Sequence, residues 1–138
     1  MFNLPLPFAD AMIAQALKED PLECCGLLAG EDGRIVRVFP ATNAAKSPFR
    51  YVIDSKELLR LFNEIEWGDK DWKVIGNYHS HTHSEAYPSP TDVNEAHLGP
   101  DAVYLVISLK DPDQPVIRAF RIDEESKSVS EEVLNIVE

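Results

Sequence analysis

The stretch WKVIGNYHSHTHSEAYPSPTD, residues 72–92, combines an apolar run, three histidines and a loop that contains prolines. The run that precedes the histidines is typical of a β-strand, which would end inside the histidine cluster. Ser89 follows as the N-cap of a short helix, with Pro90 at its first position and Asp92 in its first turn. The stretch therefore predicts a strand end and a helix start that bring polar side chains to one edge of a sheet.

His79 and His81 are the first candidates for a metal site. Residues i and i+2 of a strand point to the same face, so the two imidazoles can bind one ion. The same short pattern also occurs where two histidines are exposed in a loop, so the pattern alone does not identify a metal site. Asp92 adds a carboxylate, and two histidines with one carboxylate match the three protein ligands of a catalytic zinc. Capping of the helix is the alternative role for Ser89 and Asp92, and the two roles are compatible.

A hydrolytic metal site also needs a group that takes a proton from water and passes it to the leaving group. Glu85 lies near the histidines, in the loop that follows them. Glu23 lies at the start of the apolar run CCGLLAG, where a charged residue requires an explanation. The residue pattern alone leaves Glu23 open between a catalytic group and a surface carboxylate.

Composition and length limit the partners and the location. The chain has 138 residues, enough for one domain, with 24 acidic and 13 basic residues and a net charge of -11. A nucleic-acid partner is not expected, because phosphate binding relies on clusters of Lys and Arg. No apolar run approaches the ~20 residues of a membrane span, and the N-terminus does not resemble a signal peptide. The only cysteines, Cys24 and Cys25, are adjacent and form no disulfide framework, so we expect a soluble cytoplasmic protein.

The rest of the chain alternates helical and strand patterns. Helices are predicted at residues 7–19, 54–69 and 89–99, the second with a capping box of Asp54 and Glu57. A hairpin with an Asp32-Gly33 turn is predicted for 24–41. Further strands are expected at 49–54, 72–80, 102–109 and 115–123, and the tail 127–138 stays open between a strand and a helical turn. These elements predict a single α/β domain over residues 1–138, a mixed β-sheet flanked by helices.

The spacing of the polar residues resembles a known motif. His79-Ser80-His81, seven residues, Ser89, two residues and Asp92, with Glu23 upstream, are similar to the JAMM motif of the MPN (Mov34/PAD-1) metallopeptidase family. The segments ECCGLLAG and FPATNAAKSPFRYVID resemble the small prokaryotic, Mec+-like branch of that family. The resemblance extends from about residue 8 to the C-terminus and implies an MPN-type fold.

The resemblance also implies roles for the motif residues. His79, His81 and Asp92 would bind one Zn²⁺ per chain, Glu23 would act as general acid and base, and Ser89 would stabilise the oxyanion. Ser80 would point to the opposite face of the strand and support the structure. The remaining histidines, His83 and His97, are expected outside the ligand set.

The implied activity is zinc-dependent hydrolysis of the amide or isopeptide bond at the C-terminal Gly-Gly of a ubiquitin-like sulfur-carrier protein. For the Mec+-like branch, the released group would be cysteine, formed on the carrier during cysteine biosynthesis. Two alternatives remain: a zinc hydrolase of short peptides or small molecules, and a non-catalytic MPN scaffold that binds partners. Members of the scaffold class usually lack motif residues, whereas all five are present here.

Overall fold

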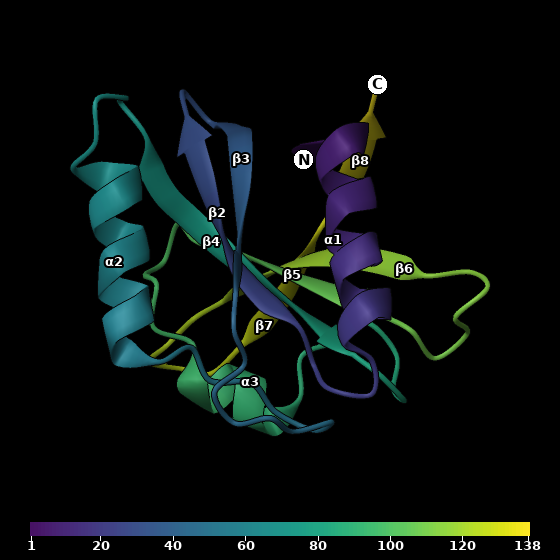
Figure 1. Ribbon diagram of the computed structural model, residues 1–138. Coiled ribbons are helices and arrows are strands. Elements are labelled where there is room, and N and C mark those ends of the chain that lie inside the picture. Colours follow the sequence, from purple (N-terminus) through teal and green to yellow (C-terminus); the bar gives the residue numbers. More distant parts are fainter.

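A six-stranded mixed sheet forms the centre of the protein, whose computed structural model describes all 138 residues (Figure 1). The strand order is β3-β2-β4-β5-β6-β7, and only the β4–β5 pair is parallel. The strands are β2 (Cys25–Glu31), β3 (Arg34–Ala41), β4 (Lys73–His81), β5 (Val103–Ser108), β6 (Val116–Ile122) and β7 (Val129–Glu132). The predicted α/β class with a mixed sheet is confirmed.

The β2–β3 hairpin turns where the sequence predicts it. Asp32 and Gly33 both adopt positive φ angles, 52° and 78°. Two consecutive positive φ angles are what a tight type I′ turn requires, and an Asp-Gly pair adopts them at low cost. The turn aligns β2 with β3, the edge strand of the sheet.

Helices α1 (Leu6–Glu19) and α2 (Ser55–Glu66) cover opposite faces of the sheet (Figure 1). Alternate residues of β2 point to opposite faces, so Leu28 packs in the cluster under α1 and Leu27 packs in the cluster under α2. Each fully buried leucine of this kind contributes about 1.5–3 kcal/mol through removal of apolar surface from water. The two clusters hold the central strands between the helices.

The start of α2 differs in one detail from the predicted capping box. The Asp54 carboxylate accepts hydrogen bonds from the backbone N–H groups of Lys56 and Glu57, as an N-cap does. The Glu57 carboxylate, however, accepts the backbone N–H of Thr42 instead of turning back to Asp54. The predicted return bond of the capping box, from the backbone N–H of Asp54 to the Glu57 carboxylate, is therefore wrong. Glu57 instead connects the helix to the residue after β3.

The strand predicted at residues 49–54 does not form. Only Ile53 makes an isolated bridge, with Asn43, and the surrounding residues lie in a loop. The side chain of Asn43 bonds to the carbonyl of Arg50 and the N–H of Val52, and so satisfies backbone groups that a strand partner would otherwise bind.

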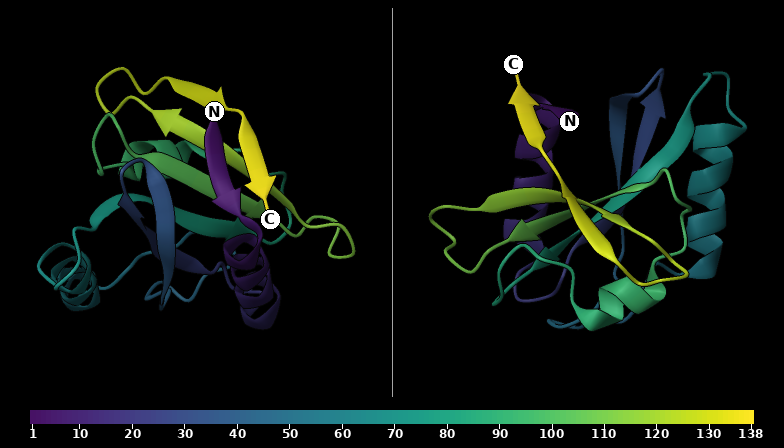
Figure 2. Two further views of the ribbon diagram at one scale, coloured as in Figure 1. Left: turned by 90° about the horizontal axis from the view of Figure 1, so that it is seen from above. Right: turned by 180° about the vertical axis from the view of Figure 1, so that it is seen from behind.

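Both ends of the chain meet in a second, two-stranded sheet. The tail forms two strands, β7 and β8 (Leu134–Val137), and β8 pairs in parallel with β1 (Phe2–Pro5), which the sequence analysis did not predict. Figure 2 shows β1 and β8 side by side, with both termini at this part of the molecule. Phe2 and Leu4 are buried in the cluster under α1, so this small sheet closes one end of the core.

Strand β4 lies between β2 and β5 and carries the histidines at its C-terminal end. Gly76 faces the carbonyl oxygen of Val103 on β5 so closely that a Cβ atom would overlap it. The third helix, α3 (Pro90–Glu95), is shorter than the predicted 89–99 and packs against β5 with Val93. None of the three helices combines the length and the apolar character that a membrane crossing requires.

Candidate metal centre

Alternation along β4 separates two sets of side chains. Tyr78 and Ser80 point to the α1 side, where Tyr78 is buried in the core and donates its hydroxyl hydrogen to Gln15. The hydroxyl oxygen of Ser80 accepts the backbone N–H of Cys24 at 2.8 Å, which confirms its predicted supporting role. His79 and His81 point to the opposite face, where both contact Asp92 in the first turn of α3.

Asp92 reaches the two histidines from the first turn of α3. Ser89 is the N-cap: its hydroxyl oxygen accepts the N–H of Asp92 at 3.1 Å, and Asp92 Oδ2 accepts the N–H of Ser89 at 2.8 Å. This reciprocal capping box fixes the side chain of Asp92 and directs its carboxylate toward the sheet. Asp92 therefore completes the cap that Ser89 begins and also occupies the predicted ligand position.

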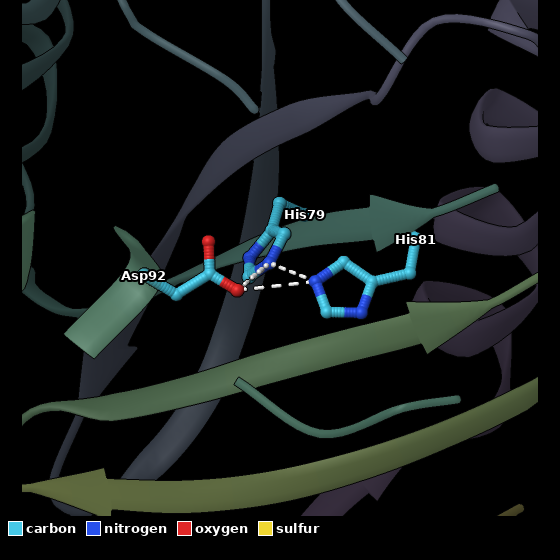
Figure 3. A group of neighbouring side chains, drawn as sticks. All are labelled: His79, His81 and Asp92. Atoms are coloured by element: carbon cyan, nitrogen blue, oxygen red, sulfur yellow. Dashed lines mark hydrogen bonds and ion pairs between the residues drawn. The ribbon is translucent and has the colours of Figure 1, made fainter. Parts of the chain in front are cut away.

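The three side chains converge on one point (Figure 3). Asp92 Oδ2 lies 3.0 Å from His79 Nε2 and 3.1 Å from His81 Nε2, and the two Nε2 atoms are 3.2 Å apart. All three residues are buried. Four-coordinate zinc with bonds of about 2.0–2.1 Å separates its ligand atoms by about 3.3 Å, so the spacing fits a tetrahedral ion.

The surroundings of His81 fix which nitrogen is available to a metal. His81 Nδ1 lies 2.9 Å from the carbonyl oxygen of Glu85, which can only accept, so Nδ1 carries the hydrogen. In the neutral ring, Nε2 then presents its lone pair to the point of convergence. Glu85 thus contacts His81 through its backbone carbonyl, and the residue itself is exposed.

His79 is held by an aromatic ring. Tyr51 stacks on it with ring centroids 4.5 Å apart and an interplanar angle of 23°. The hydroxyl of Tyr51 accepts a hydrogen bond from the amide of Asn77, on the same face of β4. Sequence reasoning did not find Tyr51, because nothing in the loop pattern distinguishes it from other aromatic residues.

Charges in the cluster shift the protonation equilibria of its members. Burial alone would raise the pKa of Asp92, but hydrogen bonds from His79 and His81 hold it well below its ordinary value. Burial likewise opposes the charged form of His81, but its hydrogen bonds to Asp92 and to the carbonyl of Glu85 raise its pKa. Asp92 is therefore held ionised, as a carboxylate ligand to a cation must be.

Glu23 lies beside this cluster. It lines a cavity of about 260 Å³ together with His81 and Ser89. Its side chain is buried and Oε1 has no hydrogen-bond partner, and burial raises its pKa to about 8. A carboxyl group with a pKa near neutrality can both accept and return a proton, which suits a general acid and base.

The other polar residues of the loop stand outside the cluster. His83 is exposed, and its Nδ1 lies 2.8 Å from the hydroxyl of Thr82. Glu85 contributes only its backbone carbonyl. The five residues of the predicted motif lie together, and their chemical roles stay predictions.

The protein is thus of the α/β class, with a mixed sheet and a capped helix that bring two histidines and one aspartate into an arrangement compatible with a metal ion. A family model described as "Prokaryotic homologs of the JAB domain" matches residues 5–123, and the chain belongs to this family.

Two curated relatives are enzymes. The chain is 45% identical over 131 residues to the CysO-cysteine peptidase of Mycobacterium tuberculosis, which covers 94% of this chain and 86% of the relative. It is 38% identical over 96 residues to the desampylase of Haloferax volcanii, 67% of each chain. The prediction of an enzyme, a hydrolase of the JAB family, is confirmed, and the alternative of a non-catalytic scaffold is set aside.

Solved structures show the same fold. A protein from Desulfitobacterium hafniense superimposes with a TM-score of 0.86 at 34% identity and covers all of this chain and 94% of its own. A JAB1/MPN domain protein from Archaeoglobus fulgidus gives a TM-score of 0.59 at 17% identity, over 100% and 98% of the two chains. The predicted MPN-type fold is confirmed.

Proposed function

We propose that the protein is a zinc-dependent peptidase that cleaves the amide bond after the C-terminal Gly-Gly of a ubiquitin-like sulfur-carrier protein. The observation that carries the proposal is the convergence of His79, His81 and Asp92 beside a buried, protonatable Glu23. Relatives named for CysO-cysteine and for desampylation support a small protein as substrate. The higher identity to the CysO-cysteine peptidase favours cysteine as the released group, and with it a place in cysteine biosynthesis.

Zn²⁺ is the metal we assign to His79, His81 and Asp92, one ion per chain. When bound, it supplies Lewis acidity, which polarises the scissile carbonyl and lowers the pKa of a coordinated water to near 7. Two imidazole nitrogens and one carboxylate oxygen are ligands that zinc would accept.

Glu23 moves the proton in this proposal. Its carboxylate takes a proton from the attacking water and then donates it to the nitrogen of the leaving amine. Its position in the same cavity as His81 and Ser89 supports this role, and the absence of a competing partner at Oε1 leaves that oxygen available.

Ser89 stabilises the developing oxyanion. Its hydroxyl oxygen already accepts the N–H of Asp92, and its hydroxyl hydrogen remains available to donate. A donor fixed by a helix cap needs no reorganisation when negative charge develops on the substrate oxygen.

Residues 1–138 act as one domain in this proposal, without a nucleic-acid or membrane partner. The two cysteines are buried and free, which is compatible with the reducing cytoplasm.

The test is incubation with ubiquitin-like carriers that end in Gly-Gly followed by one cysteine, read by intact mass. We expect the loss of one residue from the carrier, no loss with Glu23→Gln, and normal cleavage with Glu125→Gln, an exposed control. A hexapeptide with the same C-terminus distinguishes the alternative. If it is cleaved as fast as the carrier, the enzyme is a short-peptide hydrolase and the proposed substrate class is wrong.

A further inference from the structure

Asn43 is a buried polar residue that the proposed chemistry does not use. It lies just after β3, and only 4% of its surface is exposed. Its amide nitrogen donates to the carbonyl oxygens of Glu23 and Arg50, both at 3.0 Å, with a longer contact to that of Ser47 at 3.5 Å. Its amide oxygen accepts the N–H groups of Ala45 and Val52, both at 3.0 Å. The hydrogen-bonding capacity of the amide is therefore fully used.

Hydrogen bonds hold the backbone of Glu23 on both sides. The carbonyl oxygen of Glu23 accepts from the amide of Asn43, and the backbone N–H of Glu23 donates to the carbonyl oxygen of Ser47 at 3.0 Å. Both partners belong to the loop of residues 42–54, which has no strand ladder of its own. The backbone position of Glu23 is thus set by this loop, and the loop is set by Asn43.

The same loop touches the metal side of the site. Tyr51 stacks on His79, and the carbonyl oxygen of Pro48 accepts the hydroxyl of Thr82 at 3.3 Å, one residue after His81. The buried side-chain amide of Asn43 therefore connects Glu23 to a loop that also contacts β4. No other side chain bonds to both Glu23 and this loop among the hydrogen bonds of the protein.

We propose that Asn43 is a positioning residue that fixes Glu23 relative to His79, His81 and Asp92. The part of this inference that concerns catalysis rests on the proposed function. Only an asparagine supplies donor and acceptor at this reach: aspartate cannot donate when ionised, and serine is too short to span the loop. Displacement of a proton-transfer group by about 1 Å lowers turnover by about 100-fold without a matching loss of substrate binding.

The first test measures hydrogen exchange of the Glu23 amide in the metal-loaded protein, with the amides of β5 as an internal reference. We expect faster exchange at Glu23 in Asn43→Asp, with β5 unchanged. Asn63→Asp is the matched control, because Asn63 is exposed on α2 and bonds to neither Glu23 nor the loop. If Asn43→Asp does not fold, Asn43→Ser, which adds no charge, replaces it.

The second test measures kcat and KM on the carrier that ends in Gly-Gly-Cys, together with the metal content. We expect kcat to fall about 100-fold in Asn43→Asp, while KM and metal content stay within about twofold of the native values. The exchange measurement needs no substrate, so it tests whether Asn43 positions Glu23 even if the native protein cleaves no carrier. Unchanged exchange at Glu23 in a folded variant, or a kcat that falls only in proportion to the unfolded fraction, would overturn the proposal.

Discussion

Asp92 combines two functions at the scale of a single residue. It caps α3 through the N–H of Ser89 and presents the same oxygen to His79 and His81. The cap restricts the rotamer, so the carboxylate is directed toward the histidines before any ion binds. An asparagine at this position can still cap the helix but carries no charge.

Metal content therefore tests Asp92 apart from folding. We expect about one zinc per chain in the native protein purified without chelator, and less than about 0.1 in Asp92→Asn after dialysis, because the ligand charge is lost. Asp69→Asn, an exposed control, should keep its zinc. Elemental analysis measures both, and full zinc occupancy in Asp92→Asn would contradict the ligand assignment.

Glu23 gives the metal-free protein a defined pH dependence. Its pKa is raised by burial from 4.5 to about 8, so between these values the unfolded chain has released a proton that the folded chain retains. The free energy of unfolding contributed by Glu23 is fully present below pH 4.5 and is lost as the pH rises through 8, by up to about 1.4 kcal/mol per pH unit.

Urea unfolding of the chelated protein between pH 5.5 and 8 measures this dependence. His81, whose pKa is also raised, adds a slope of the same sign, so the difference between the native protein and Glu23→Gln isolates Glu23. We expect the smaller slope in Glu23→Gln. Equal slopes would show that Glu23 is ionised in the folded protein throughout this range.

Sequence reasoning grouped residues that the structure also places close together, with clear limits. The i, i+2 spacing of His79 and His81 and the cap signature at Ser89 are local rules, and the structure obeys both. Tyr51 and Asn43 were missed because their roles depend on contacts with residues far away in the chain. No periodicity marks a loop residue that stacks on a distant ring or bonds to a distant peptide group.

At the scale of elements, the segments with the clearest local patterns were the predictable ones. Helix α2 and the continuous apolar run of β5 formed where their patterns indicate. The segment 49–54 has strand-like composition, yet Asn43 binds its backbone groups and keeps it a loop. Strand β1 is only four residues long and depends on a partner at the other end of the chain, so no local pattern predicts it.

Gly76 shows how closely β4 must approach β5. A Cβ at Gly76 would overlap a backbone oxygen of Val103, whereas a Cβ at Gly26 would overlap the ring of Tyr78. A ring can rotate or shift, but a backbone oxygen moves only if the β4–β5 pairing moves with it.

We therefore expect Gly76→Ala to lower the free energy of unfolding by more than about 3 kcal/mol, and Gly26→Ala by about 1–3 kcal/mol. Urea denaturation of the two variants provides the comparison. A tolerated Gly76→Ala would mean that β4 and β5 can separate without loss of the sheet.

At the scale of the whole molecule, the two-stranded sheet and the candidate metal centre occupy different ends. Figure 1 shows both termini at the top and α3 at the bottom. Leu134 packs against the main core cluster beside β1, whereas Asp92 and the histidines lie where α3 meets β4. Stability and metal binding should therefore respond separately to changes in β8.

Deletion of residues 134–138 tests this separation. We expect the free energy of unfolding to fall by at least about 2 kcal/mol, because β1 loses its partner and Leu134 its burial, and Tm to fall by about 6 °C or more. Zinc content per folded chain should not change. Deletion of Glu138 alone is the control, and an unaffected Tm in the longer deletion would show that β8 contributes nothing to the core.

The parallel pairing of β1 and β8 also makes the chain suitable for circular permutation. Because the two strands pair in register for four residues, the first residue of β1 and the last residue of β8 lie roughly 11 Å apart, and a linker of about five residues can join the termini just beyond them. New ends could open at the exposed Asp32-Gly33 turn, at the tip of a hairpin. In such a chain the order of Glu23 and the histidines would be reversed, and the site would be assembled from a C-terminal Glu23 and N-terminal metal ligands.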